Sequence, residues 1–226
     1  MPQIISIVGK PRSGKTTLLQ GLITELKRRG LRVATIKHST HEFKLDSPGK
    51  DSWLLAQAGS ELVIFSSPQS LAYIRKVDKE VSLDELSHLV GEDFDIVLTE
   101  GYTRERCPKI EVHRRQQGTN LISPVEELIA IASDESLDTN LPQYTLDDFK
   151  GLVELIEGRV RARRGETGET EVALFADGKS VPLNPFVKEV IARTLLGMAS
   201  ALKGLAKATK LDISVRIKNN KEVSHQ

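Results

Sequence analysis

The chain has 226 residues, of which 39% are hydrophobic, and a formal net charge of +1. This length allows one large domain or one domain with a small addition, and the hydrophobic share suffices for a folded core. The near-neutral charge argues against binding to nucleic acid or to a membrane surface, and no run of about 18 apolar residues could span a bilayer. A single cysteine, Cys107, excludes an intramolecular disulfide and fits a reducing compartment. The first residues lack the features of a signal peptide, so we expect a cytoplasmic protein.

The first 38 residues predict one β-α-β unit. Residues 3–9 form a short apolar run, which indicates a buried strand ending at Gly9. Apolar residues at helical spacing then predict a helix that starts at Thr16 and that Gly30 closes. Residues 31–38 indicate a second strand. Because such a crossover connects parallel strands, we expect a mainly parallel sheet with flanking helices.

Strands and helices keep alternating up to residue 164. The expected elements are a helix at 51–59, strands at 61–67 and 70–77, a helix at 82–90, strands at 94–101, 109–114 and 127–134, and a long helix at 145–164. Ser82 and Glu85 form a capping box for the helix at 82–90, and Thr145 is the expected cap of the helix at 145–164. We therefore expect one α/β domain over residues 1–164.

A small ββαβ module is expected at the C-terminus. Residues 165–170 are Gly-rich and polar and predict a linker. Residues 171–226 then contain two short strands around an Asp-Gly turn, a helix capped by Asn184 with Pro185 in its first position, and a strand at 211–217. So small a module could hardly hold a core alone. Its helix carries an apolar stripe, which would either form the module's core or contact a second subunit or partner.

The stretch "GKPRSGKTT", residues 9–17, carries the chemistry. It matches the phosphate-binding pattern G-x-x-x-x-G-K-[ST], and it follows a strand and opens a helix, as the mechanism requires. Gly14 lets the backbone approach a phosphate, Lys15 would reach the β- and γ-phosphates, and the Thr16 hydroxyl would bind Mg²⁺. The sequence therefore predicts a P-loop NTPase fold that binds a nucleoside triphosphate.

Acidic and polar residues follow two other expected strands. Glu100 ends the strand "DIVLTE", at the sheet edge where ligands bind in open α/β folds, and is the candidate carboxylate for holding Mg²⁺. The loop after residue 38 contains His38, His41 and Asp46. The two histidines are weak support for zinc, whereas Asp46 could contact phosphate or Mg²⁺.

A basic stretch lies at residues 104–115, after Glu100. It forms either a solvated face or a cradle for a second anionic ligand. Cys107 lies in this stretch before a proline, and we interpret it as a bystander rather than a nucleophile.

Four stretches resemble one known family in their order and spacing. "GKPRSGKTT", "IKHSTHEFKLDSPGKDS", "LTEGYTRERCPKIEVHR" and "IAIASD" are similar to the MobB family, molybdopterin-guanine dinucleotide biosynthesis protein B, over residues 3–160. The resemblance implies a GTP-binding protein, typically a homodimer with weak GTPase activity. It implies that the protein assists a nucleotidyltransferase that attaches GMP to molybdopterin, giving the dinucleotide form of the molybdenum cofactor. The family pattern does not cover residues 171–226.

The resemblance also implies site residues, with GTP and Mg²⁺ as cofactors. The phosphate loop would use Gly9, Lys10, Ser13, Gly14, Lys15, Thr16 and Thr17. The second motif would use Lys37, His38, His41, Asp46, Gly49, Lys50 and Asp51, and the acidic strand end would use Glu100 and Gly101. Thr16, Asp46 and Glu100 would hold the metal, and Glu100 and Asp46 would serve hydrolysis.

Some points stay open. No N-K-x-D motif for guanine is present, and Asp134 is either its substitute or an ordinary loop residue. Lys10 lies five residues before Lys15, the spacing of the lysine that reaches across some dimeric P-loop ATPases, or is a simple loop residue. A small-molecule kinase and a metal-insertion GTPase remain alternative functions, although no convincing catalytic base and no Cys/His-rich tract stand out.

Overall fold

The computed structural model describes residues 2–39, 49–91, 93–118, 120–166, 172, 174–176, 179–181, 183–202, 211 and 213. The chain divides into two compact units, the first with residues 1–168 and 177–180, and the second with residues 169–176 and 181–226.

A six-stranded sheet forms the centre of the first unit. Its order is β2-β5-β1-β6-β7-β8, with β1 at Gln3–Val8, β2 at Val33–Lys37, β5 at Ile96–Glu100, β6 at Lys109–His113, β7 at Leu128–Ser133 and β8 at Gln143–Tyr144. All neighbouring pairs are parallel, which confirms the expected sheet. In the register, Glu100 lies opposite both Ile7 and Lys37. The carboxyl ends of the strands therefore share one edge, where a ligand site is expected.

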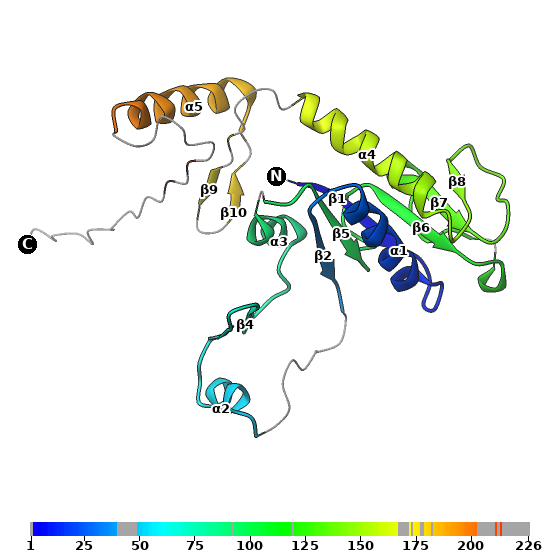
Figure 1. Ribbon diagram of the computed structural model, residues 1–226, viewed down its shortest axis with the longest axis horizontal. Coiled ribbons are helices and arrows are strands. Elements are labelled where there is room, and N and C mark those ends of the chain that lie inside the picture. Colours follow the sequence, from blue (N-terminus) through cyan, green and yellow to red (C-terminus); the bar gives the residue numbers. More distant parts are fainter. Residues whose placement is uncertain are drawn as a thin grey trace, which may run out of the picture. The chain divides into compact units, whose positions relative to one another are not determined.

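Helices α1 (Lys15–Arg28) and α4 (Phe149–Glu166) run side by side across the sheet (Figure 1). They approach closely because α1 has a glycine at the crossing: a Cβ on Gly21 would lie 2.3 Å from the ring of Phe149. The buried core combines apolar side chains of both helices with those of the central strands, among them Ile5, Leu18, Leu22, Leu26, Leu98, Ile110, Leu152 and Ile156. Burial of this apolar surface is the main stabilising contribution.

The first unit also contains a segment with exposed apolar side chains. Helix α2 (Asp51–Gln57) precedes an antiparallel hairpin of β3 (Leu62–Ser66) and β4 (Leu71–Arg75). Helix α3 (Leu83–Val90) follows, and the Ser82 hydroxyl accepts a hydrogen bond from the Glu85 backbone, which confirms Ser82 as its cap. Two short 3₁₀ turns lie at Arg115–Gln117 and Val125–Glu127.

The start of α4 differs from the sequence prediction. Thr145 does not cap it, because the helix begins only at Phe149 and the Asp148 carboxylate accepts a hydrogen bond from the Gly151 backbone at 2.9 Å. Thr145 instead donates to Asp147 at 2.7 Å. Residues 143–144 form the short edge strand β8, which the sequence did not predict. At its other end α4 extends to Glu166, into the first two residues of the predicted linker.

Beyond α4, β9 (Leu174–Ala176) and β10 (Lys179–Val181) form a two-stranded sheet, and helix α5 spans Pro185–Ser200. The Asn184 side chain accepts from the Val187 backbone at 2.9 Å, as expected for the cap of α5. The predicted strand 211–217 lies outside the described residues except for Leu211 and Ile213. None of the helices in the described ranges has the length and apolar character needed to cross a membrane.

Candidate nucleotide-binding site

The phosphate loop joins β1 to α1 and needs glycine at two positions. Gly9 has φ of 144°, and a Cβ there would lie only 2.4 Å from the backbone oxygen of Val112. Gly14 is left-handed, with φ of 101°, and is the N-cap of α1. Residues other than glycine rarely adopt these backbone conformations. The glycines therefore fix the turn that points the first backbone N–H groups of α1 toward the sheet edge, an arrangement that suits an anion.

Lys15 arches back over this loop. Its ammonium donates hydrogen bonds to the backbone oxygens of Gly9 at 3.0 Å and Lys10 at 2.9 Å. Burial lowers the pKa of Lys15, while Glu100 raises it and Lys37 lowers it. The hydroxyl of Ser13 is buried and has no hydrogen-bond partner among the described residues. A held ammonium, free backbone donors and an unpartnered hydroxyl together fit a polyphosphate.

Thr16 and Glu100 meet at the carboxyl ends of adjacent strands. The Thr16 hydroxyl lies 3.0 and 3.2 Å from the two oxygens of Glu100, and Lys37 Nζ lies 3.8 Å from that carboxylate. Mg²⁺ in such sites takes a hydroxyl or carboxylate together with phosphate oxygens and water. The pair fits this role, and within the described ranges no cluster of three or more Cys, His, Asp or Glu side chains offers another metal site.

The segment after β6 holds the phosphate loop from the other side. Arg114 Nε donates to the backbone oxygen of Ser13 at 3.0 Å. Lys10 Nζ donates to the Gln117 backbone oxygen at 2.6 Å, and the Gln117 side chain donates to the Pro11 backbone oxygen at 2.8 Å. In this arrangement Lys10 is tied within its own chain. Arg114 belongs to the predicted basic stretch, but nothing in the local sequence marks its contact with Ser13 or the role of Gln117.

Asp134 is held by the same segment. Its carboxylate accepts from the Arg115 backbone at 2.8 Å and from Arg114 Nη1 at 3.3 Å. The Arg115 hydrogen bond, followed by that of Arg114, lowers the pKa of Asp134. Asp134 is therefore linked to the phosphate loop through Arg114, and both of its oxygens are engaged by Arg114 and Arg115.

His38 and Gly101 flank Glu100. The His38 backbone N–H donates to the backbone oxygen of Glu100 at 2.9 Å. A Cβ on Gly101 would lie 3.4 Å from His38. The His38 ring nitrogen lies 2.6 Å from Glu80, and its ring is 4.9 Å from that of Tyr102. The ring is thus paired with Glu80.

Among the other predicted residues of the second motif, those that the structure describes do not contact the phosphate loop. His41 and Asp46 lie outside the described residues. Gly49, Lys50 and Asp51 lead into α2, where Lys50 and Asp51 are exposed. Their side chains make no hydrogen bond or ion pair with the phosphate loop in the part of the chain that the structure describes. Thr17 is exposed in the first turn of α1.

Two basic side chains of β6 are paired with carboxylates. Lys109 is fully buried and pairs with Glu127 and the backbone oxygen of Glu105. His113 lies 2.9 Å from Glu135. These two are therefore not part of an anion cradle, whereas Arg114 remains beside the phosphate loop. Burial raises the pKa of the Cys107 thiol, which disfavours a nucleophilic thiolate.

A pocket of about 560 Å³ opens where β7 and β8 end. Its lining comes from the segments that follow these strands: Ser133, Asp134, Glu135, Ser136, Gln143, Tyr144, Thr145, Leu146 and Asp147. Of these residues the sequence predicted a binding role only for Asp134, and Thr145 was expected as a helix cap. The volume falls within the range of small-molecule sites.

Comparison with known proteins finds one family. The family model "Molybdopterin guanine dinucleotide synthesis protein B" matches residues 4–134. The molybdopterin-guanine dinucleotide biosynthesis adapter protein of Haemophilus influenzae is 37% identical over 155 residues, which are 68% of this chain and 87% of that protein. The putative adapter protein of Methanocaldococcus jannaschii is 26% identical and aligns with 94% of this chain and 98% of its own length. That alignment takes in most of residues 171–226, beyond the resemblance found in the sequence analysis.

Solved structures agree with the fold. A crystal structure of molybdopterin-guanine biosynthesis protein B is 30% identical, with a TM-score of 0.55, and covers 69% of this chain and 99% of its own. A MobB homologue from Bacillus stearothermophilus, 24% identical with a TM-score of 0.56, covers 71% of this chain and 99% of its own. At 24% identity, the likeness to the Bacillus stearothermophilus structure shows the fold alone. The P-loop architecture and the phosphate loop identify a nucleotide-binding protein.

Proposed function

Because this chain belongs to the MobB family, we propose that it is a GTP-binding adapter in molybdenum cofactor biosynthesis. In this role it assists a nucleotidyltransferase that attaches GMP to molybdopterin, and it hydrolyses GTP weakly. The names of its relatives, which are adapter proteins of molybdopterin-guanine dinucleotide biosynthesis, support the pathway. The observation that carries the proposal is the placement of Lys15, Thr16 and Glu100 at one sheet edge, next to the glycine-shaped phosphate loop.

Each of these residues has a part in holding Mg²⁺–GTP. The loop backbone from Gly9 to Thr16 and the Ser13 hydroxyl would donate to phosphate oxygens, with Lys15 turning from the loop carbonyls to the β- and γ-phosphates. Thr16 and Glu100 would hold the metal, Glu100 through water. When bound, Mg²⁺ neutralises charge on the phosphates. Asp46 would be an additional carboxylate for the metal, and Lys37, 3.8 Å from the Glu100 carboxylate, would be a cation close to the phosphates.

Weak hydrolysis fits the residues that surround this site. An efficient GTPase needs a group that orients the attacking water and a cation that stabilises charge in the transition state. Arg114 supplies a cation beside the loop, but its Nε and Nη1 are engaged with Ser13 and Asp134. We infer that the protein binds the nucleotide to organise a complex and turns it over slowly.

The homodimer is proposed on a separate observation. Apolar side chains of α2 and the β3–β4 hairpin are exposed in the single chain, and they include Leu54, Leu55, Leu62, Ile64, Phe65, Leu71 and Tyr73. Exposed apolar clusters are uncommon on monomers and mark protein contacts. A second copy of this chain is the occupant expected from the family resemblance, which makes this hairpin the proposed dimer surface.

Reconstitution tests the adapter role. A nucleotidyltransferase of the same pathway is incubated with molybdopterin and Mg²⁺–GTP, with and without this protein, and the guanine dinucleotide formed is quantified. We expect the parent to raise the yield and Lys15→Ala to lose the effect, while Lys27→Ala, which removes an exposed lysine of the same helix, retains it. An equal yield with and without the parent would contradict the adapter role.

A further inference from the structure

The pocket at the ends of β7 and β8 lies on the same edge of the sheet as the phosphate loop. All strands are parallel, and β6 alone separates β7 from β1. With neighbouring strands about 4.8 Å apart, the end of β7 is about 10 Å from the strand that leads into the phosphate loop. A nucleotide with its phosphates in that loop extends along the edge over a comparable distance. The pocket is therefore placed to receive the other end of the same ligand.

One side chain connects the pocket with the phosphate loop. Arg114 donates to the Ser13 backbone in the loop and to Asp134 in the pocket wall. A Cβ on Gly14 would lie 3.4 Å from Nη2 of this arginine. The two sites thus share Arg114 as part of their walls.

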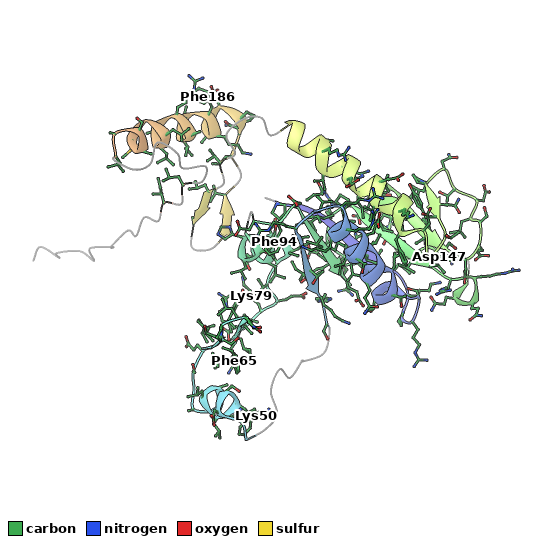
Figure 2. The ribbon with its side chains drawn as sticks, viewed as in Figure 1. Lys50, Phe65, Lys79, Phe94, Asp147 and Phe186 are labelled. Carbon is green, nitrogen blue, oxygen red and sulfur yellow. The ribbon has the colours of Figure 1, made fainter. Side chains whose placement is uncertain are left out.

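Three carboxylates line the pocket, and they differ in their partners. Asp134 has both oxygens engaged, by Arg115 and Arg114. Glu135 lies 2.9 Å from His113 and 3.9 Å from Arg115. Asp147 accepts a hydrogen bond from Thr145 through Oδ1, is exposed, and pairs with no other side chain among the described residues. Figure 2 labels Asp147, beside the strands that form this end of the sheet.

The chemistry of Asp147 suits one class of base. The hydrogen bond from Thr145 lowers the pKa of its carboxyl group, so that it is an ionised acceptor at neutral pH. Guanine presents two adjacent donors, N1–H and N2–H, to such an acceptor. Adenine presents an acceptor nitrogen at the first position and no amino group at the second, so it would set a lone pair against the carboxylate and donate no hydrogen bond to it. Tyr144 and Leu146 supply apolar surface beside it.

We propose that the pocket between the ends of β7 and β8 binds the guanine base, with Asp147 as the residue that recognises it and Asp134 as a positioning residue that fixes Arg114 on the phosphate loop. The proposal rests on the GTP binding proposed above. It also reassigns base recognition, for which the sequence had suggested Asp134.

Nucleotide titrations of the full chain test the assignment. Isothermal titration of GTP, ATP, xanthosine triphosphate and inorganic tripolyphosphate is compared for the parent, Asp147→Asn, Asp134→Asn and Asp138→Asn. Asp138 is an exposed carboxylate of the same loop outside the pocket lining and provides the matched control. We expect Asp147→Asn to weaken GTP about tenfold or more and to strengthen xanthosine triphosphate, because an amide accepts from N1–H and donates to the O2 of xanthine. Its tripolyphosphate affinity should equal that of the parent.

Asp134→Asn should behave differently. Loss of its charge loosens Arg114 beside the phosphate loop, so GTP, xanthosine triphosphate and tripolyphosphate should weaken together without a change in base preference. Circular dichroism melting confirms that each variant is folded. If the parent prefers GTP but Asp147→Asn keeps that affinity and gains none for xanthosine triphosphate, the pocket assignment is overturned while GTP binding stands. A switch of base preference in Asp134→Asn would overturn it too. A parent without preference for GTP over ATP would instead contradict the proposed guanine ligand itself.

Discussion

The hydroxyl of Thr16 lies 3.0 Å from the carboxylate of Glu100, although 84 residues separate them in the chain. Thr16 opens α1 directly after the phosphate loop, and Glu100 ends β5, the neighbour of β1. Parallel pairing of these strands is what brings the two oxygen groups together. They form the metal-binding part of the proposed site, with the ammonium of Lys37 3.8 Å from the carboxylate.

Glu100→Gln should separate hydrolysis from binding. The amide keeps the size of the side chain but holds a hydrated Mg²⁺ poorly, while the loop and Lys15 still hold the phosphates. We expect Mg²⁺-dependent GTP hydrolysis to fall and GTP affinity to stay within about tenfold, or about 1.4 kcal/mol. Phosphate release and titration calorimetry measure the two quantities, with Asp95→Asn at the other end of the strand region as the control. Hydrolysis at the parent rate would remove Glu100 from the site.

The phosphate loop should not tolerate a side chain at Gly9. Gly9 has φ of 144°, so a side chain there would strain the backbone. A Cβ would also lie 2.4 Å from the backbone oxygen of Val112, so β6 would have to move. We expect Gly9→Ala to lower the free energy of unfolding by about 1–3 kcal/mol and to weaken nucleotide binding. Thermal and denaturant unfolding measure the loss. Gly158→Ala in α4, where a Cβ meets nothing within 4 Å, is the control and should stabilise the protein by about 0.5–1 kcal/mol.

The parts of this site that the sequence predicted are those with a local pattern. The phosphate loop is contiguous, and its glycines, lysine and threonine have fixed spacing, so residues 9–17 could be identified without a structure. Glu100 could be placed because it ends an apolar strand, and the carboxyl ends of parallel strands share one edge. Both predictions need only short-range periodicity and one topological rule.

The missed parts depend on long-range contacts. Arg114 meets Ser13 across 101 residues, and Lys10 meets Gln117 across 107, and no local pattern indicates which partner either cation takes. Strand β8 has only two residues, too few for a visible alternation. Thr145 was a sound cap by residue type, but Asp148 lies closer to the first helical turn and occupies that position instead.

Acid should remove one contribution to the stability of α1. Hydrogen bonds from Arg28 and then Arg29 lower the pKa of Glu25 to about 2 from an unfolded value of 4.5, and Arg29 also pairs with Glu157 of α4 at 2.9 Å. Because the folded pKa is the lower one, the stabilisation is complete above pH 4.5 and is lost as the pH falls from there toward 2. We therefore expect Glu25→Gln to be less stable than the parent at pH 7 and the difference to shrink as the pH falls below 4.5 and through about 2. Parallel denaturant titrations over this range measure it, and a difference that does not depend on pH would contradict the ion pair.

The exposed hairpin should govern self-association. Phe65 of β3, labelled in Figure 2, is 38% exposed in the single chain, and Ile64 beside it is 58% exposed. If a second copy covers this surface, a polar replacement leaves a polar group in an apolar contact, which costs binding energy. We expect Phe65→Ser to shift sedimentation toward the monomer, whereas Leu89→Ser, which removes an exposed leucine of α3, leaves the distribution of the parent. A parent that sediments as a monomer at all concentrations would contradict the proposed dimer.

The C-terminal unit should serve protein contact rather than nucleotide binding. Helix α5 has one buried residue, Ala192, among those described, while Phe186, Met198 and Leu202 are 73%, 67% and 61% exposed. The described part of this unit contains no phosphate loop and no Cys, His, Asp or Glu cluster for a metal. The buried core of the first unit, by contrast, comes from elements between β1 and α4.

We therefore expect truncation after Gly168 to leave GTP affinity unchanged and to weaken self-association or binding to the nucleotidyltransferase. Met198→Asp in the full chain should weaken the same contact, because it places a charge on the exposed apolar face without shortening the protein. Arg193→Gln, an exposed change on the same helix that removes no apolar surface, provides the matched control. Titration calorimetry reports the nucleotide, and sedimentation and pull-down report the partner. A truncated protein that stays folded but no longer binds GTP would instead place this unit in the nucleotide site.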